Sequence, residues 1–219
     1  MKFYIDSAHI SIIESLMKTG VFHGVTTNPL ILRKDGVPLH PAQLSDFARR
    51  VLDLGVRELF FQSWGEDSVT LSRHGQQLAS ISNKVVVKLP ATREGLEAAA
   101  RLAGEGIRTC ITAVYAPFQA LLAASVGAAY VAPYLGRMND AGRDGHAMIA
   151  RMSEALRNTQ SPSEILAASV RAPEDVARLA QNGVRCITLS PAVAEMLFQE
   201  PLTMEATMAF EAASGEIAK

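Results

Sequence analysis

The sequence contains few cysteines, no excess of either charge and no spacing typical of a metal site. Cys110 and Cys186 are its two cysteines among 219 residues, and the five histidines are scattered. This pattern matches neither a disulfide framework nor a set of metal ligands, so we expect reduced thiols, a cytoplasmic location and no bound metal. The 21 basic side chains are balanced by 22 acidic ones. That balance argues against a nucleic acid partner, which would require a positive surface.

Signatures of nucleotide cofactors and of serine hydrolases are also missing. The chain has neither a G-x-G-x-x-G fingerprint nor a phosphate-binding P-loop. Ser63 and Ser169 lack the G-x-S-x-G context of a hydrolase nucleophile. We therefore expect an activity that needs no cofactor.

One long uncharged stretch has the length of a membrane span. No charged residue occurs between Arg108 and Arg137, and a transmembrane helix needs about 20 apolar residues. Pro117 and Pro133 interrupt this stretch, and Asp6 comes too early for the apolar core of a signal peptide. We expect buried elements of a globular protein here, with no membrane partner.

Short apolar runs alternate with segments of helical periodicity along the chain. Between the runs, apolar residues recur at helical spacing, as at Ile10, Ile13 and Leu16. Strands that alternate with helices predict a parallel α/β sheet, either doubly wound or closed, and eight units favour a (β/α)8 TIM barrel. We predict a single domain over residues 1–219 with a C-terminal helical segment at about 202–215. The eight predicted strands cover residues 3–6, 24–28, 59–63, 85–89, 110–114, 130–134, 165–169 and 186–190.

Polar side chains stand near the C-terminal ends of these strands, where TIM barrels carry their active sites. Lys88 is the most informative, because it follows Val85, Val86 and Val87 and precedes Leu89. Burial disfavours the charged ammonium form, and a neutral amine can attack a carbonyl to form a Schiff base. The alternatives are a lysine that extends to solvent or one that forms a salt bridge at the strand end.

Five motifs occur in the order of a known family: GVTTNP (24–29), VVVKLP (85–90), GIRTCITAVY (106–115), YVAPYLGR (130–137) and ILAAS (165–169). From Asp6 to about Met196 the chain resembles the small transaldolase and fructose-6-phosphate aldolase family. The resemblance implies a (β/α)8 barrel, metal-free class I aldolase chemistry through a lysine imine, and a homo-oligomeric ring, a pentamer or decamer. Lys88 matches the imine-forming lysine of this family.

Two positions place the chain on the aldolase side of the family. The third strand usually carries Glu in transaldolases and Gln in the aldolases. The sixth strand usually carries Phe in transaldolases and Tyr in the aldolases. This chain has Gln62 and Tyr134, so it resembles the aldolases at both positions. The resemblance implies that Gln62, Thr112 and Tyr134 hold a water for proton transfer near the imine. The resemblance also implies substrate-binding residues for hydroxyl and phosphate groups, namely Asp6, Thr26, Asn28, Arg137 and Ser169.

Some of these residues have simpler explanations. The T-T-N-P sequence also suits a turn from strand to helix, which would explain Thr27 and Asn28. We interpret Arg171 as a solvated loop charge. The chain departs from the family at residues 33–40 and at Gly136, where the family commonly has Asn. These changes lie near the expected substrate entrance.

We expect a fructose-6-phosphate aldolase-like enzyme that cleaves or forms the bond between dihydroxyacetone and an aldehyde phosphate. The first alternative is a transaldolase, which transfers the dihydroxyacetone unit between sugar phosphates. A non-catalytic sugar-phosphate-binding barrel is a second, and a purely structural ring-forming protein is a third. Retention of Lys88 with its three polar neighbours argues against the last two.

Overall fold

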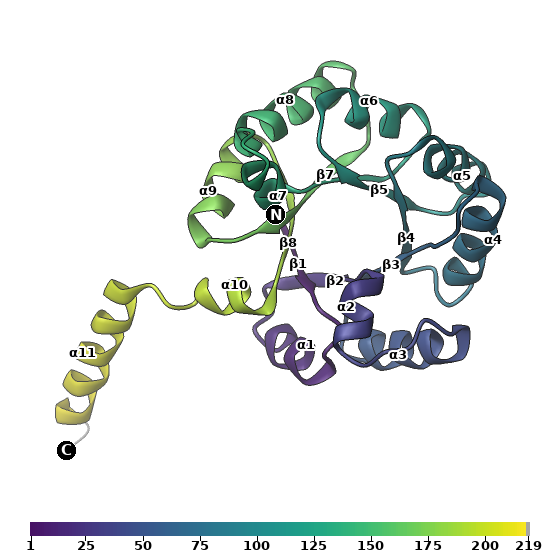
Figure 1. Cartoon of the computed structure of the whole chain (residues 1–219). Helices are drawn as coiled ribbons and strands as arrows, with labels where there is room; N and C mark the ends of the chain where they lie inside the picture. The colour runs from purple at the N-terminus through teal and green to yellow at the C-terminus, as the bar shows by residue number, and fades with distance from the viewer. Residues whose placement is uncertain (218–219) are drawn as a thin grey trace.

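Eight parallel strands close into a barrel in chain order (Figure 1), and the doubly wound alternative is thereby excluded. The computed structural model describes residues 1–217. The predicted (β/α)8 barrel is confirmed. The strands are β1 (Lys2–Asp6), β2 (Phe22–Thr26), β3 (Glu58–Gln62), β4 (Val85–Pro90), β5 (Thr109–Val114), β6 (Tyr130–Pro133), β7 (Glu164–Val170) and β8 (Cys186–Leu189).

Helices surround the barrel and connect its strands (Figure 1). Several begin with proline at their first position, where the missing N–H costs no hydrogen bond; Pro173 and Pro191 do so, as the sequence predicts. The helices are α1 (Ile10–Met17), α2 (Pro29–Lys34), α3 (Pro41–Asp53), α4 (Ser68–Ala79), α5 (Arg93–Gly104), α6 (Pro117–Ser125), α7 (Leu135–Asp140), α8 (Gly145–Asn158), α9 (Pro173–Gln181), α10 (Pro191–Met196) and α11 (Pro201–Ile217).

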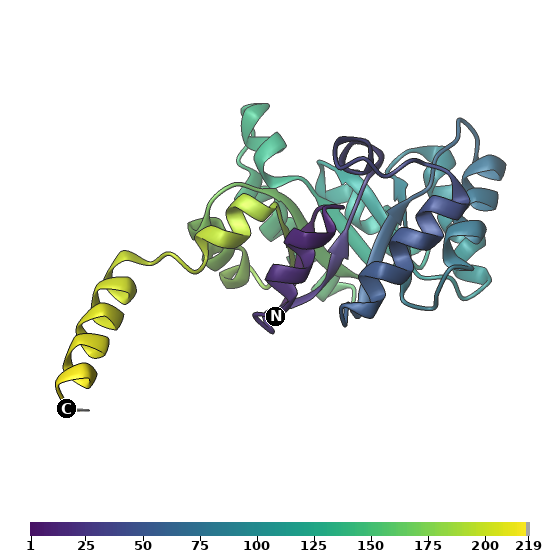
Figure 2. The ribbon, with the colours of Figure 1, turned by 90° about the horizontal axis from the view of Figure 1, so that it is seen from below.

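Four strands, β2, β3, β6 and β8, end one or two residues earlier than their apolar patterns suggest, and two of these differences matter for the site. Strand β2 ends at Thr26, so Thr27 and Asn28 belong to the turn into α2. Strand β6 ends at Pro133, and Tyr134 is the N-cap of α7. Both short helices rise from the same end of the barrel in Figure 2. This is the end at which the strands reach their C-termini.

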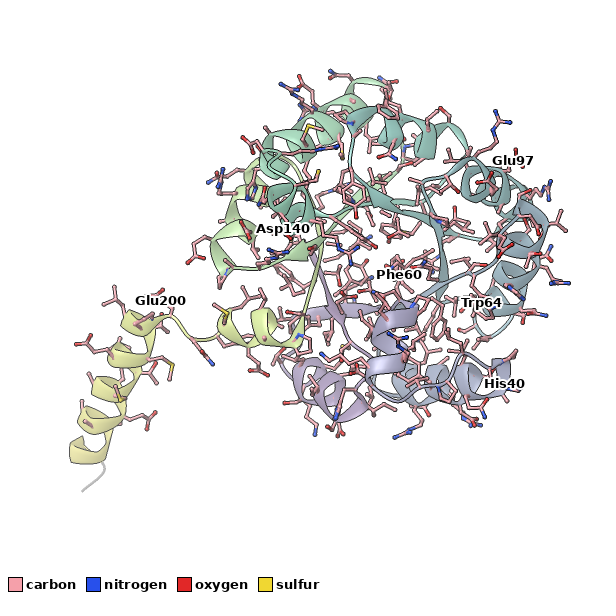
Figure 3. The ribbon with its side chains drawn as sticks, viewed as in Figure 1. His40, Phe60, Trp64, Glu97, Asp140 and Glu200 are labelled. Atoms are coloured by element: carbon pink, nitrogen blue, oxygen red, sulfur yellow. The ribbon has the colours of Figure 1, made fainter. Side chains whose placement is uncertain are left out.

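Alternate residues of each strand point into the barrel. The middle of the interior is filled by an apolar cluster that includes Tyr4, Phe60 and Leu166, and Figure 3 shows Phe60 near the barrel centre. Gly24 makes room for the Tyr4 ring, because a Cβ at Gly24 would lie 2.9 Å from the Tyr4 Cδ1. The interior is therefore a packed core with a polar layer above and below it.

The lower polar layer is centred on the buried carboxylate of Glu58, at the start of β3. The Tyr4 hydroxyl donates to Glu58 Oε2 at 2.5 Å and the Tyr130 hydroxyl donates to the same oxygen at 2.9 Å. Arg108 forms an ion pair with the other carboxylate oxygen. Burial alone would raise the pKa of Glu58, but hydrogen bonds from Tyr4, Tyr130 and Arg108 hold that pKa below its usual range.

Two strands contain irregularities next to the barrel mouth. The register of β5 against β6 shifts between Thr112 and Val114, and that of β7 against β8 shifts between Ala167 and Val170. Ala113 and Ser169 both have φ of +57°, a conformation that is uncommon for residues other than glycine. Such bulges redirect side chains near functional sites.

Helix α11 projects away from the barrel (Figures 1 and 2). Its exposed apolar side chains are Leu202, Met204, Met208 and Phe210. Within residues 1–217 no helix combines the length and apolarity needed to cross a membrane. The uncharged stretch between Arg108 and Arg137 instead forms β5, α6 and β6.

Replacing the buried carboxylate tests the lower layer. We expect Glu58→Gln to reduce the free energy of unfolding by about 3 kcal/mol, since it leaves Arg108 unpaired and offers an amide to two hydroxyl donors. Because the folded-state pKa of Glu58 is lowered, its contribution is present above the unfolded pKa of about 4.3 and is lost as pH falls through the folded pKa.

Thermal unfolding between pH 3 and 7 measures both effects. The variant should melt roughly 6–12 °C lower near neutral pH and lose less stability than the parent on acidification. Asp46→Asn is the matched control, because it removes an exposed carboxylate that is also paired with an arginine. Equal melting temperatures for Glu58→Gln and the parent would contradict this account.

Candidate active site

A polar cavity of about 140 Å³ opens at the C-terminal ends of the strands. A groove of about 720 Å³ between α3 and α4 is larger, but exposed helix residues such as Asp46 and Arg49 line it and it contains no lysine. We place the candidate site in the smaller cavity because it gathers side chains from β1, β2, β4, β7 and β8. Its lining consists of Asp6, Thr26, Asn28, Lys88, Ala132, Tyr134, Arg137, Leu166, Ala168, Ser169 and Thr188.

Lys88 lies on β4 with 5% of its surface exposed. Its Nζ donates a hydrogen bond of 2.8 Å to the carbonyl oxygen of Thr27. Within residues 1–217 its amine forms no ion pair, so Lys88 is neither a solvent-extended lysine nor half of a strand-end salt bridge. A buried amine that borders a cavity is placed to react with a small carbonyl compound.

The T-T-N-P turn gives each of its polar residues a different role. The Thr26 hydroxyl points into the barrel and donates to Asp6 Oδ1 at 2.6 Å. Thr27 points the other way, where its hydroxyl donates to the Phe60 carbonyl oxygen at 2.8 Å. Asn28 Oδ1 accepts from the backbone N–H groups of Leu30 and Ile31, so it caps α2.

Asn28 thus combines the capping role with a place in the cavity wall. Its amide oxygen is fully engaged by α2, so the Nδ2 amino group is the polar group left for a ligand. This orientation makes Asn28 a hydrogen-bond donor toward the cavity.

Thr112 and Tyr134 meet across the mouth of the barrel. Their hydroxyl oxygens lie 2.8 Å apart, although they come from β5 and from the residue after β6. The Tyr134 ring packs edge-to-face against Tyr115 and lies 4.8 Å from the Arg137 guanidinium carbon. Gln62 is paired in register with Lys88, but neither Gln62 nor Thr112 is among the cavity-lining residues.

The electrostatics of the cavity are dominated by three charged groups. Burial raises the pKa of Asp6, while Lys88, the Thr26 hydrogen bond and Arg137 act in the opposite direction. Within residues 1–217, no group of three or more His, Cys, Asp or Glu side chains could hold a metal ion. The charges available to a ligand are therefore one half-buried carboxylate and two basic groups.

Arg137 from α7 and Ser169 from β7 both line the cavity. Arg171 does not line the cavity; it is exposed and its Nη1 donates to Asp140 Oδ1 at 2.6 Å, on the helix where Figure 3 labels Asp140. The departure at Gly136 has a steric reason. A Cβ at Gly136 would lie 2.6 Å from both the Arg171 Nε and the Ser169 carbonyl oxygen.

Thr188 is a cavity residue that the sequence analysis did not assign to the site. Its hydroxyl oxygen lies 2.6 Å from that of Thr26, and the residue is 4% exposed. The only signal in the sequence is a threonine two residues from the end of an apolar strand run, which also fits an ordinary strand.

A closed (β/α)8 barrel with a buried lysine and convergent polar groups at the strand ends has the architecture of a barrel enzyme. The comparisons with known proteins identify its family. Residues 3–219 match the model of the family Transaldolase/Fructose-6-phosphate aldolase. The chain belongs to this family, and it is an enzyme of the aldolase and transaldolase type.

Curated relatives extend over nearly the whole chain. A probable transaldolase of Exiguobacterium sibiricum is 39% identical over 205 residues, which cover 94% of each chain. A probable transaldolase of Aquifex aeolicus is 38% identical and covers 93% of this chain and 91% of its own.

Solved structures that resemble the chain support the fold alone. A lactate oxidase of Pediococcus acidilactici has a TM-score of 0.61 at 12% identity, with 87% of this chain and 63% of that chain covered. A mandelate oxidase has a TM-score of 0.58 at 17% identity and covers 85% and 60%. The chain thus spans less than two thirds of either oxidase.

Substitutions at Asn28 separate capping from ligand binding. Asn28→Asp keeps an oxygen to cap α2 but removes the amide donor, so we expect little change in melting temperature and a 5–150-fold lower kcat/KM for a sugar phosphate, on the order of one lost hydrogen bond. Thr92→Ala removes a cap of α5 outside the cavity and should cost about 1 kcal/mol with activity retained. Parent-like activity in Asn28→Asp would make Asn28 only a helix cap.

Proposed function

We propose that this protein is a class I aldolase of the fructose-6-phosphate aldolase type, which uses a Lys88 imine. Its substrate is a ketose phosphate, and its products are dihydroxyacetone and an aldehyde phosphate, in a reaction that also runs in reverse. The observation that carries the proposal is the buried Lys88 amine in one cavity with the Tyr134 phenol, which Thr112 orients at 2.8 Å.

The chemistry begins at the ketone carbon. The Lys88 amine adds to the carbonyl, and the carbonyl oxygen leaves as water, which produces an imine. The bond between the α and β carbons, counted from the imine carbon, then breaks. Its electron pair moves toward the imine to form an enamine. The hydroxyl on the β carbon loses its proton, and that carbon becomes the carbonyl carbon of the aldehyde. Protonation of the enamine carbon and hydrolysis of the imine release dihydroxyacetone.

Polar residues in the cavity and beside it would orient the substrate and assist proton transfer. Tyr134, with Thr112 and a water held by Gln62, supplies general acid–base help. Asp6, Thr26 and Asn28 offer acceptors and donors to the substrate hydroxyls. Arg137 and Ser169 are suited to a terminal phosphate, because a guanidinium and a hydroxyl both donate hydrogen bonds to phosphate oxygens.

Transaldolase activity is the second candidate, since the curated relatives carry the name probable transaldolase. Both activities share the imine and differ in whether the dihydroxyacetone unit is released or passed to another aldehyde. A phenol beside the imine favours release because it can protonate the enamine.

We also propose a cytoplasmic homo-oligomer, a pentamer or decamer. The free, buried thiols of Cys110 and Cys186 suit a reducing compartment. The exposed apolar side chains of α11 would be covered by neighbouring subunits. Light scattering on the intact chain measures the subunit number, and a monomer would contradict the assembly.

Borohydride trapping tests the imine. Incubation with dihydroxyacetone or a ketose phosphate, followed by reduction, should add the donor to Lys88, as located by peptide mass spectrometry. Lys88→Met should abolish both adduct and turnover. Lys84→Met is the matched control, because Lys84 precedes β4 at the opposite end of the barrel and donates to the Val56 carbonyl. An adduct on Lys84 instead would contradict the role of Lys88, and no adduct with any ketose would favour a barrel that only binds sugar phosphates.

Removal of one hydroxyl separates aldolase from transaldolase. Tyr134→Phe should lower the release of dihydroxyacetone by about 10²–10⁴-fold, the usual range for general acid–base catalysis. Trapping on Lys88 and transfer between sugar phosphates should decline much less. Tyr115→Phe removes a hydroxyl from the neighbouring ring and should leave release unchanged. If Tyr134→Phe releases dihydroxyacetone as fast as the parent, the phenol only packs and the aldolase assignment fails.

A further inference from the structure

Three side chains at the barrel mouth form a continuous hydrogen-bonded chain. Thr188 on β8, Thr26 on β2 and Asp6 on β1 come from three adjacent strands, with β1 in the centre. The Thr26 hydroxyl lies 2.6 Å from Asp6 Oδ1 and 2.6 Å from the Thr188 hydroxyl oxygen. Thr26 and Thr188 are 1% and 4% exposed, so bulk water does not compete for these bonds.

Proton counting fixes the direction of the chain when Asp6 is ionised. A carboxylate can only accept, so the single proton of Thr26 must point to Asp6. The short contact between Thr26 and Thr188 is then a hydrogen bond only if Thr188 donates. The order of donation is Thr188 to Thr26 to Asp6.

We propose that Thr188 is a positioning residue whose hydroxyl holds the Thr26 hydroxyl as a donor to Asp6 Oδ1 and so keeps the Asp6 carboxylate oriented as an acceptor toward the substrate. Within residues 1–217 the other carboxylate oxygen of Asp6 has no hydrogen-bond partner, although Asp6 lines the cavity. That oxygen is the acceptor left for a substrate hydroxyl. The inference rests on the proposed function for the identity of that substrate, a polyhydroxylated ketone.

The strength of the Thr26–Asp6 bond depends on Thr188 because hydrogen bonds in a chain polarise one another in a low-dielectric interior. A Thr26 oxygen that accepts a proton from Thr188 is a stronger donor to Asp6. The charged groups that act on Asp6 are Lys88 from β4 and Arg137 from α7. Both favour the carboxylate, and burial opposes them by raising the pKa of Asp6.

Protonation of Asp6 would reverse the chain. A carboxylic acid can donate its proton to the Thr26 hydroxyl, which would then donate to Thr188. Asp6 would then no longer accept a hydrogen bond from Thr26. Thr188 therefore favours the ionised, accepting state of Asp6. Loss of the Thr188 hydroxyl should raise the pH at which Asp6 takes up a proton.

The experiment follows the Asp6 carboxyl by NMR titration of the intact chain labelled with ¹³C at the aspartate carboxyl carbons, with Asp6→Asn for assignment. The Thr188→Val variant keeps the side-chain shape and removes only the hydroxyl. We expect the Asp6 midpoint to rise by about 0.1–0.7 pH units, which corresponds to 10–30% of a hydrogen bond to a charged group. Thr188→Ser should restore the parent midpoint.

Thr109→Val is the matched control, because Thr109 is also a buried barrel threonine but its hydroxyl has no hydrogen-bond partner among the described residues 1–217. This variant should leave the Asp6 midpoint unchanged. An Asp6 midpoint in Thr188→Val equal to that of the parent, or a shift that Thr188→Ser does not reverse, would overturn the positioning role.

Activity provides a second readout and separates this inference from the proposed function. The acid limb of the kcat/KM profile should move upward in Thr188→Val in step with the NMR midpoint. If the parent forms a borohydride adduct on Lys88 but the Asp6 midpoint does not move in Thr188→Val, the positioning role of Thr188 fails and the aldolase assignment stands. If the Asp6 midpoint moves but no ketose gives an adduct, the positioning role of Thr188 stands and the aldolase assignment fails.

Discussion

The closure of eight parallel strands, each with alternate side chains inside, is the constraint on which the rest of this molecule depends. Because the strands run in one direction, their C-termini meet at one mouth and their inward residues stack in layers. Glu58, Phe60 and Gln62 lie on the same face of β3, so one strand contributes to the lower polar layer, the apolar middle and the mouth. The chemistry at the mouth is thus separated from water below by a packed core.

The mouth itself is shaped by departures from regular strands. The bulges at Ala113 and Ser169 bring backbone into a conformation that costs free energy for these residues. Ala113 follows Thr112, which contacts Tyr134, and Ser169 itself lines the cavity. Close packing also shapes the mouth at Gly136, where the backbone of α7 approaches Ser169 and Arg171. The packed layers below the mouth hold the backbone in this strained conformation.

Much of the fold and of the candidate site could be predicted from the sequence, because strand runs, helical periodicity and polar strand ends are local patterns. Lys88 was identifiable as a lysine between three valines and a leucine, and β4 places it in the barrel. The role of Asn28 could not be decided from the sequence, since a helix cap and a ligand-binding residue have the same sequence pattern. In the structure Asn28 caps α2 and also lines the cavity. Arg171 was interpreted as a solvated charge, and it is exposed but paired with Asp140. Thr188 was missed because a threonine in an apolar strand has no distinctive neighbour.

The sequence by itself determined the order of strands and helices and the parallel direction of the sheet, since these follow from periodicity and from the alternation of strands with helices. The tertiary structure decided which side chains meet. Thr188 and Thr26 are 162 residues apart in the chain, and Thr112 lies on β5 whereas Tyr134 follows the end of β6. Their contacts depend on the stagger of neighbouring strands at barrel closure and on the bulges that shift it. These are long-range packing effects that no local pattern encodes.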